Sequence, residues 1–203
     1  MTIGPGTSWS HPGLLPAGAV TIASDRALSD LAQRSRIAGQ NVPIVGLTGG
    51  TLWQALGGPS VPGRLLTSDA RHYAVDLVRA ELDGRNVWFV GSLVAHSGGW
   101  RHAVAVMNTP WFRSLRLGHR SHPGDALLDI TEATDLRVDD LRKIVPRARH
   151  GAHHPHPKLK ERRVSEASWT FSPARRVVID GHRVGRCHTL RVVVEPDALT
   201  VVV

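Results

Sequence analysis

The chain has 203 residues, of which 41% are hydrophobic and 21% charged, a composition typical of a globular protein that buries its own core. No apolar run approaches the roughly 20 residues that cross a bilayer, and the N-terminal stretch lacks the basic start and apolar segment of a secretory signal. We therefore expect a cytoplasmic protein, and its single cysteine, Cys187, excludes an internal disulfide.

The formal net charge of +8 is compatible with an anionic partner but does not identify one. Only three of the 25 basic residues are lysine, and such an arginine-rich balance also arises from the base composition of a genome. Nucleic acid, an anionic membrane surface and a phosphorylated metabolite are therefore open alternatives at this point.

The sequence pattern of residues 1–45 predicts an irregular arm followed by a β-α-β unit. Residues 1–18 contain four Gly and three Pro without periodicity, which is typical of an arm. The apolar run 19–23 favours a buried strand, and apolar residues recur with helical spacing over about 26–38 after the candidate caps Ser24 and Asp25. A second strand is expected at 42–45, which completes the unit.

A Gly-rich turn at 46–50 leads into a short helical stretch at 51–56. Gly57, Gly58 and Pro59 then stop any helix. We expect residues 19–70 to form a reduced, Rossmann-like α/β lobe.

From residue 71 onward the pattern predicts an antiparallel β-domain. Two apolar segments, 74–82 and 86–95, flank Asp83-Gly84, a strong hairpin signal. One amphipathic helix is expected at about 138–147. Further strands are expected at 102–108, 126–132, 164–171, 174–180, 188–195 and 198–203. The predicted fold class is α+β, with the reduced α/β lobe joined to an antiparallel β-sandwich-like lobe at 71–203.

Asp180 and His182 are the candidate catalytic residues. Asp180 follows the apolar run 177–179, so it emerges from a buried strand at a Gly turn. If the strand geometry continues, His182 lies on the same face about 6 to 7 Å away. A carboxylate paired with an imidazole is a workable acid-base unit. The alternative is that Asp-Gly is a plain hairpin turn and His182 a solvated turn residue.

This segment and the following Pro-x-Ala-Leu at 196–199 resemble the end of the diacylglycerol kinase and sphingosine kinase family, where an Asp-Gly-Glu turn carries the catalytic base. Here His182 replaces the Glu. Other segments resemble the family in the same order along residues 19–203: 23–28 (Gly-Gly-Asp-Gly-Thr-Leu in the family), 47–57 (Gly-Thr-Gly-Asn-Asp-Phe-Ala-Arg-x-Leu-Gly), Asp76, Asn108, 124–129 and 151–159.

The resemblance implies a cleft between the lobes in which the nucleotide positions fall on Asp25, Arg26, Thr48, Gly49 and Gly50. The family's diglycine loop cradles phosphates because glycine lets backbone N–H groups approach the anion. Side chains at positions 24, 26 and 27 should distort that cradle.

The resemblance also implies that a leading strand and helix of the family are missing, so a second copy or a partner chain would have to complete the lobe. On the substrate side it favours Trp53, Asn108 and Trp111.

Three functions are therefore open. The leading interpretation is a repurposed, ATP-independent enzyme in which Asp180 and His182 perform acid-base chemistry on a small, partly apolar, hydroxylated substrate, with no cofactor expected. The second is a kinase that uses ATP and Mg²⁺ to phosphorylate a lipid or another hydroxyl. The third is a non-catalytic ligand-binding or regulatory pseudokinase.

A His-rich stretch contains His150, His153, His154 and His156. These spacings can present two imidazoles to one ion, but zinc sites normally take three or four ligands and the only cysteine is distant in sequence. We expect no metal here and instead an exposed basic loop that continues to residue 163. Docking of this loop on an anionic lipid surface is an alternative, and nucleic acid is a weaker one.

Overall fold

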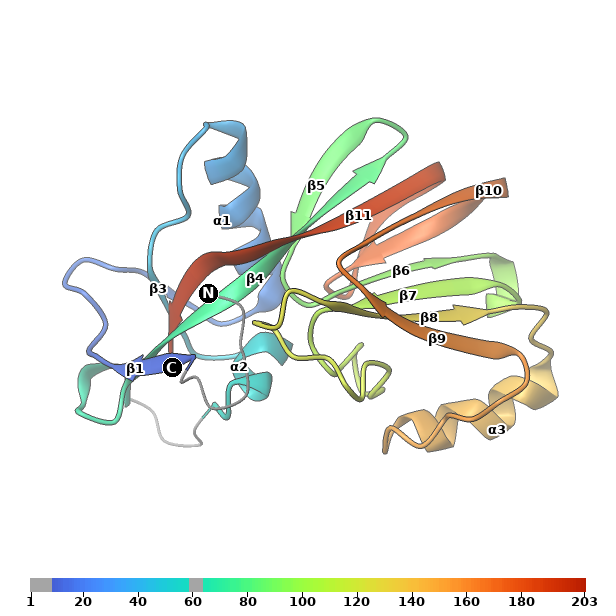
Figure 1. Ribbon diagram of the computed structural model, residues 1–203, viewed down its shortest axis with the longest axis horizontal. Coiled ribbons are helices and arrows are strands. Elements are labelled where there is room, and N and C mark those ends of the chain that lie inside the picture. Colours follow the sequence, from blue (N-terminus) through green and yellow to red (C-terminus); the bar gives the residue numbers. More distant parts are fainter. Residues whose placement is uncertain (1–8, 59–63) are drawn as a thin grey trace.

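The computed structural model describes residues 9–58 and 64–203. Three helices and eleven strands follow one another in these parts of the chain (Figure 1). In chain order they are β1 (Ser10–Pro12), β2 (Thr21–Ile22), α1 (Asp25–Ile37), β3 (Val45–Leu47), α2 (Thr51–Ala55), β4 (Arg71–Leu82), β5 (Arg85–Phe89), β6 (Ser92–His96), β7 (Ala103–Met107), β8 (Leu128–Ala133), α3 (Val138–Ala148), β9 (Leu159–Val164), β10 (Glu166–Ile179) and β11 (His182–Val202).

All strands belong to one hydrogen-bonded sheet. Its main path runs β1-β4-β11-β10-β6-β7-β8-β9, with antiparallel pairing throughout this path. β5 pairs with β4, and β2 and β3 pair in parallel with each other and, through β3, with the end of β11. Figure 1 shows that β4, β5 and β11 lie over β6 to β9, so the long sheet curls into two layers.

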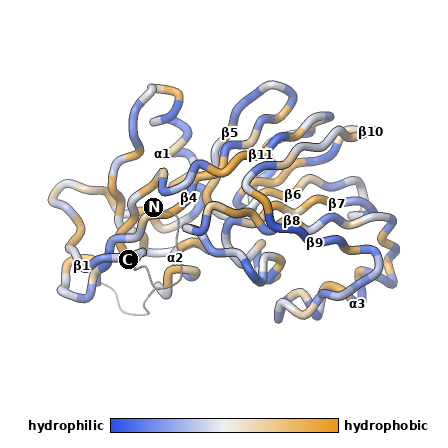
Figure 2. Tube along the Cα trace, in the orientation of Figure 1, coloured by the Kyte–Doolittle hydropathy of each residue, from blue (hydrophilic) through white to orange (hydrophobic). Residues whose placement is uncertain are grey.

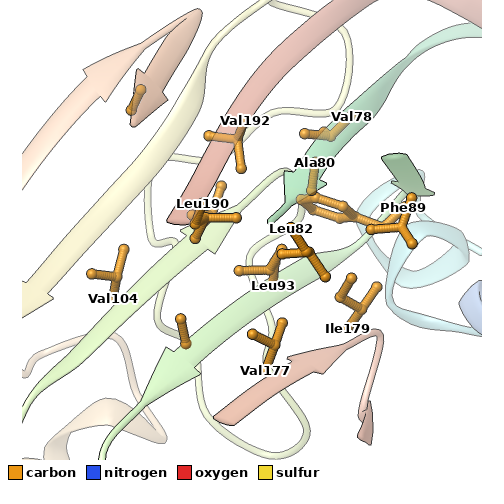
Figure 3. Close-up of a cluster of buried hydrophobic side chains, with 14 of the residues drawn as sticks. Val78, Ala80, Leu82, Phe89, Leu93, Val104, Val177, Ile179, Leu190 and Val192 are labelled. Atoms are coloured by element: carbon orange, nitrogen blue, oxygen red, sulfur yellow. The ribbon is translucent and has the colours of Figure 1, made fainter. Parts of the chain in front are cut away.

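The main core fills the space between these layers. Phe89, Leu93, Leu190 and Val192 are each at most 1% exposed and belong to one cluster that draws on both layers. Their side chains point toward one another in Figure 3. Burial of each such side chain stabilises the fold by about 1.5–3 kcal/mol. Orange segments in Figure 2 lie along the central strands, including β6, in which all five residues are buried.

The N-terminal part contains the expected β-α-β unit, since β2, α1 and the parallel strand β3 follow in order. Ser24 caps α1 and accepts a hydrogen bond from the backbone N–H of Ala27 at 3.3 Å. Leu28 and Ala32, four residues apart, bury one face of the helix against a second core cluster. That cluster also contains Leu199 from β11.

The expected Rossmann-like lobe is not evident in the described residues, and this prediction is corrected. β3 pairs directly with Val201 and Val202 of β11, so the α/β segment extends the same sheet. The coarser prediction, a mixed α+β fold dominated by antiparallel pairing, is confirmed.

Several expected elements differ in extent. The predicted pairs of strands at 164–171 and 174–180, and at 188–195 and 198–203, each form one long strand with a register irregularity, β10 and β11. β1 lies in the segment expected to be an irregular arm, whose residues 1–8, like Pro59, lie outside the described residues. The helix expected at 138–147 is confirmed as α3.

The prediction of an exposed basic loop over residues 150–163 is partly wrong. Its second half forms β9, an edge strand that, among the described strands, pairs only with β8. Lys158 pairs with Asp140, and Arg163 pairs with Asp125 and Asp129. Within its first half, His153 is only 2% exposed.

No helix in the described part of the chain is long and apolar enough to span a membrane.

Candidate functional site

Asp180 occupies a two-residue hairpin turn between β10 and β11. Asp180 and Gly181 have φ angles of 45° and 80°, a pattern typical of a type I′ turn. The Asp180 carboxylate accepts hydrogen bonds from Ser29 Oγ at 2.6 Å and from the backbone N–H groups of Gly91 and Ser92 at 3.0 and 2.8 Å. The turn therefore aims this carboxylate at α1 and at the β5–β6 connection.

Asp25, the first residue of α1, supplies the second carboxylate. Its two oxygens accept hydrogen bonds from the backbone N–H groups of Thr51 and Leu52 at 2.7 and 3.0 Å. These N–H groups are free at the start of α2, so Asp25 satisfies them and its charge favours that helix end. Beside it, the hydroxyls of Thr51 and Thr109 lie 2.8 Å apart.

The two carboxylates converge on Gly91. A Cβ on Gly91 would lie 2.7 Å from Asp180 Oδ1, 3.1 Å from Thr51 Oγ1 and 3.5 Å from Asp25 Oδ2. Burial and the nearby charge of Asp25 raise the pKa of Asp180 to about 6. A carboxyl group with such a pKa exchanges a proton readily near neutral pH, which is what a general base requires.

His182 lies elsewhere on the hairpin. It is exposed at the start of β11, and no hydrogen bond or ion pair between it and Asp180 is found among the described residues. The hairpin turn considered as an alternative from the sequence is therefore what the backbone forms. The shared role of Asp180 and His182 stays a prediction.

The positions expected to hold a nucleotide lie close together at the start of α1 and in the Gly-rich turn before α2. Arg26 pairs with Asp30, with 2.8 Å between Nε and Oδ2. A Cβ on Gly49 would lie 2.5 Å from the backbone oxygen of Ala23, and one on Gly50 would lie 2.5 Å from Asp25 Oδ1. The two segments that resemble the nucleotide motifs thus lie in direct contact.

Thr48, in the Gly-rich turn, is held by its backbone. Its N–H donates a hydrogen bond to the backbone oxygen of Ile22 in β2 at 2.9 Å. The role of these residues in cofactor binding stays a prediction.

The three residues expected on the substrate side separate in the structure. Asn108 is fully buried and donates from Nδ2 to the backbone oxygens of Asp76 and Val90 at 3.2 and 2.8 Å. Trp53 packs against the core beside α1. Trp111 is half-buried, with the Arg116 guanidinium 6.0 Å from its ring.

A second buried carboxyl group lies next to this site. Burial raises the pKa of Asp76 to about 6, although its hydrogen bond from Ala126 N–H at 2.8 Å lowers it. Asp76 also accepts from the N–H of Asp197 at 3.1 Å, so it ties β4 to the β7–β8 connection and to the irregular part of β11.

An apolar cavity of about 370 Å³ lies between the sheet and α3, a volume within the range of small-ligand pockets. Sequence patterns did not predict this cavity. The available signal was the apolar side chains on one face of β6 to β8 together with the apolar residues of α3 that recur with helical spacing. Residues that line it include Val94, Ala105, Phe112, Ala133, Ile144 and His153.

Comparisons with known proteins support the fold. No protein-family model and no curated protein matches the sequence. Two structures of a putative diacylglycerol kinase from Bacillus anthracis str. Sterne are similar, with TM-scores of 0.65 and 0.64 at 11% and 10% identity; each comparison covers 90% of this chain and 76% of the other.

A structure of a diacylglycerol kinase from the same organism has a TM-score of 0.54 at 11% identity and covers 79% of this chain and 66% of the other. The resemblance drawn from the sequence motifs is thus confirmed at the level of structure: this chain has the fold of these diacylglycerol kinases at a sequence identity of only 10–11%.

Proposed function

We propose that this protein is an ATP-independent enzyme that acts on a hydroxyl group of a partly apolar substrate, with Asp180 as the proton acceptor. The observation that carries the proposal is the carboxyl pair at Gly91, in which burial and the charge of Asp25 raise the pKa of Asp180 to about 6.

The proton-transfer step uses the Asp180 carboxylate. In its charged form it accepts the proton of a substrate hydroxyl, and the resulting alkoxide is the nucleophile. Because the pKa lies near 6, most of the Asp180 side chains are charged at pH 7 and yet hold a proton more tightly than an ordinary aspartate does. Thr51 offers a hydroxyl beside the pair for orienting the substrate, and the buried hydroxyl of Thr109, 2.8 Å away, holds it in place.

The contacts around Asp25 support a reaction that does not use ATP. A phosphate cradle needs free backbone N–H groups at a helix start. Here Ser24 uses its own side chain to cap α1, and Asp25 caps α2. Gly49 packs against Ala23 so closely that a Cβ there would lie 2.5 Å from the Ala23 backbone oxygen, so the two turns are in direct contact at this point.

The apolar cavity supports a substrate with a hydrocarbon part. Val94 lines the cavity and lies two residues along β6 from Ser92, whose N–H binds Asp180. Two residues of a strand span about 7 Å, so the cavity wall begins about that far along β6 from the residue that binds Asp180.

A non-catalytic ligand-binding role is the second candidate, and one observation favours it. Protein donors already contact both oxygens of Asp180: Gly91 and Ser92 bind Oδ1, and Ser29 binds Oδ2. A carboxylate held this way is able to serve the fold alone.

The isomerisation of 2-monoacylglycerol to 1-monoacylglycerol tests the proposal without any cofactor. A deprotonated hydroxyl attacks the neighbouring ester carbonyl, the ester oxygen leaves and is reprotonated, and the acyl group moves. We expect Asp180→Asn to lower the rate by about 10²- to 10⁴-fold with the fold retained. His182→Gln is the matched control, and its rate should equal that of the wild type.

Each other outcome has a distinct meaning. Equal losses of rate in His182→Gln and Asp180→Asn would favour Asp180 and His182 as the acid-base pair, in place of Asp180 and Asp25. A phosphorylated lipid formed only with ATP and Mg²⁺ would favour the kinase. Saturable binding without conversion above the buffer rate would favour the ligand-binding role.

A further inference from the structure

Three imidazole nitrogens surround one carboxylate oxygen beside the outer strand of the sheet. Nε2 of His153 lies 3.5 Å from Oε1 of Glu161, and Nδ1 of His119 and Nε2 of His154 each lie 3.9 Å from the same oxygen. Glu161 belongs to β9, His153 and His154 to the α3–β9 connection, and His119 to the β7–β8 connection. Three separate parts of the chain thus bring four ligand-type atoms to one point.

These four atoms are buried, and none has a hydrogen-bond partner within the described part of the chain. His153 is the extreme case, since its side chain is 1% exposed and neither of its nitrogens has a partner. A buried polar atom without a hydrogen bond destabilises the folded protein, because it has lost its contacts with water and gained none in return. Such atoms are rare in folded proteins, and four at one point indicate a ligand that satisfies them together.

An ion pair between Glu161 and a protonated imidazole does not by itself account for the arrangement at His153. The 3.5 Å between Nε2 of His153 and Oε1 of Glu161 exceeds the length of a charge-assisted hydrogen bond, about 2.7–2.9 Å. A neutral imidazole is the form that coordinates a metal ion.

We propose that His119, His153, His154 and Glu161 bind one Zn²⁺ ion in a tetrahedral site. Three imidazole nitrogens with one carboxylate oxygen form a donor set that suits zinc, whereas Mg²⁺ and Ca²⁺ favour all-oxygen sites. Four protein ligands leave no open position, so the ion has a structural role.

The spacing requires a small inward movement of two ligands. At zinc–ligand distances of 2.0–2.2 Å, tetrahedral ligands stand about 3.4 Å apart. Measured from Oε1 of Glu161, His153 already matches and His119 and His154 exceed this spacing by about 0.5 Å. The rings of His119 and His154 also have to approach that of His153, from which their centroids lie 6.2 and 6.3 Å away. As they stand, the described side chains include no group of three or more His, Cys, Asp or Glu spaced closely enough for a metal ion.

The two ligands that must move are also the ones with freedom to do so. The side chains of His119 and His154 are 33% and 26% exposed, against 1% for His153. Modest rotations about their side-chain torsions bring both nitrogens toward the ion. The free energy of binding of structural zinc far exceeds the cost of such rotations.

The site bears on the apolar cavity as well. His153 and Leu117 line the cavity, and Leu117 is two residues from His119. Zinc would therefore fix two segments of the cavity wall to β9, whether or not the protein is an enzyme.

Zinc titration of the full chain tests the proposal. The protein is purified without a histidine tag and stripped with a chelator, and zinc affinity is measured by competition with a chromophoric chelator. Glu161→Gln and His154→Gln each remove one ligand at similar size and at a partly exposed position. His150→Gln is the matched control, because His150 is an exposed histidine of the same segment.

We expect one zinc ion per chain. Each ligand variant should weaken binding by at least about 100-fold, with His150→Gln within about twofold of the wild type. Substitution with Co²⁺ should give the strong visible absorption of a tetrahedral site. The proposal fails if the stripped chain binds no zinc at micromolar concentration, or if both ligand variants bind as tightly as the wild type.

Discussion

The carboxylates of Asp25 and Asp180, 155 positions apart in the sequence, meet at Gly91. A Cβ on that glycine would lie 2.7 Å from an oxygen of Asp180 and 3.5 Å from an oxygen of Asp25. The φ of Gly91 is not in the left-handed region, so its backbone conformation does not call for glycine. The lack of space for a Cβ is what favours glycine at this position.

Gly91→Ala should destabilise the protein by about 1–3 kcal/mol, because the added methyl group displaces the Asp180 carboxylate from its hydrogen bonds. Urea unfolding measures this. Gly98→Ala is the control, since a Cβ there meets no atom within 4 Å, and it should be neutral or slightly stabilising. Equal stability of the two variants would show that the carboxylates do not pack as described.

Asp180 should also give stability a specific pH dependence. The pKa of Asp180 is about 6 in the folded protein and 3.8 for an ordinary aspartate, so between these values the folded state binds more protons than the unfolded state. The free energy of unfolding that Asp180 contributes therefore falls as the pH rises from about 4 to 6, by about 2–3 kcal/mol in total, and is constant above about 7.

The difference in unfolding free energy between the wild type and Asp180→Asn, measured in urea from pH 4 to 8, isolates this contribution. Asp83→Asn is a matched control, because Asp83 begins the same kind of Asp-Gly turn with a φ of 48°. The backbone N–H of Thr189 lowers the pKa of Asp83, so its difference should be nearly flat between pH 5 and 7. A flat difference for Asp180 too would rule out its raised pKa.

Ser24→Ala should cost about 1 kcal/mol, because the N–H of Ala27 loses its cap at the start of α1. Ser68→Ala, at an exposed position, should leave stability unchanged. If Ser24→Ala also leaves stability unchanged, the start of α1 does not depend on this side chain, and its N–H groups are available to a phosphate.

Local sequence signals predicted several elements well. Asp-Gly turns, the capped helix α1 and the amphipathic helix α3 each rest on neighbouring residues, and all three were found. β9 was not predicted, since the edge-strand sequence Leu-Lys-Glu-Arg-Arg-Val lacks apolar alternation and its pairing comes from β8.

The candidate site was predictable only in part. The hydrogen bond from Ser29 to Asp180 joins residues 151 positions apart, a distance that no local pattern encodes. The burial of His153 was missed because polar residues with Pro neighbours are typical of exposed loops.

Filling the cavity should block the binding of an apolar ligand. Ala133→Phe places a ring in the cavity that Ala133 lines, and we expect binding of a fluorescent monoacylglycerol to weaken by at least about 10-fold. Thr134→Phe is the control, since Thr134 is the exposed next residue and does not line the cavity. Equal affinities in a fluorescence titration would place the ligand outside the cavity.

Calorimetric titration of the wild-type protein with ATP and Mg²⁺ tests most directly whether the Asp25–Asp180 site works without a nucleotide. Because Ser24 and Asp25 already occupy the N–H groups at the starts of α1 and α2, we expect no saturable binding up to millimolar ATP. Saturable micromolar binding that Asp25→Asn abolishes would contradict the account.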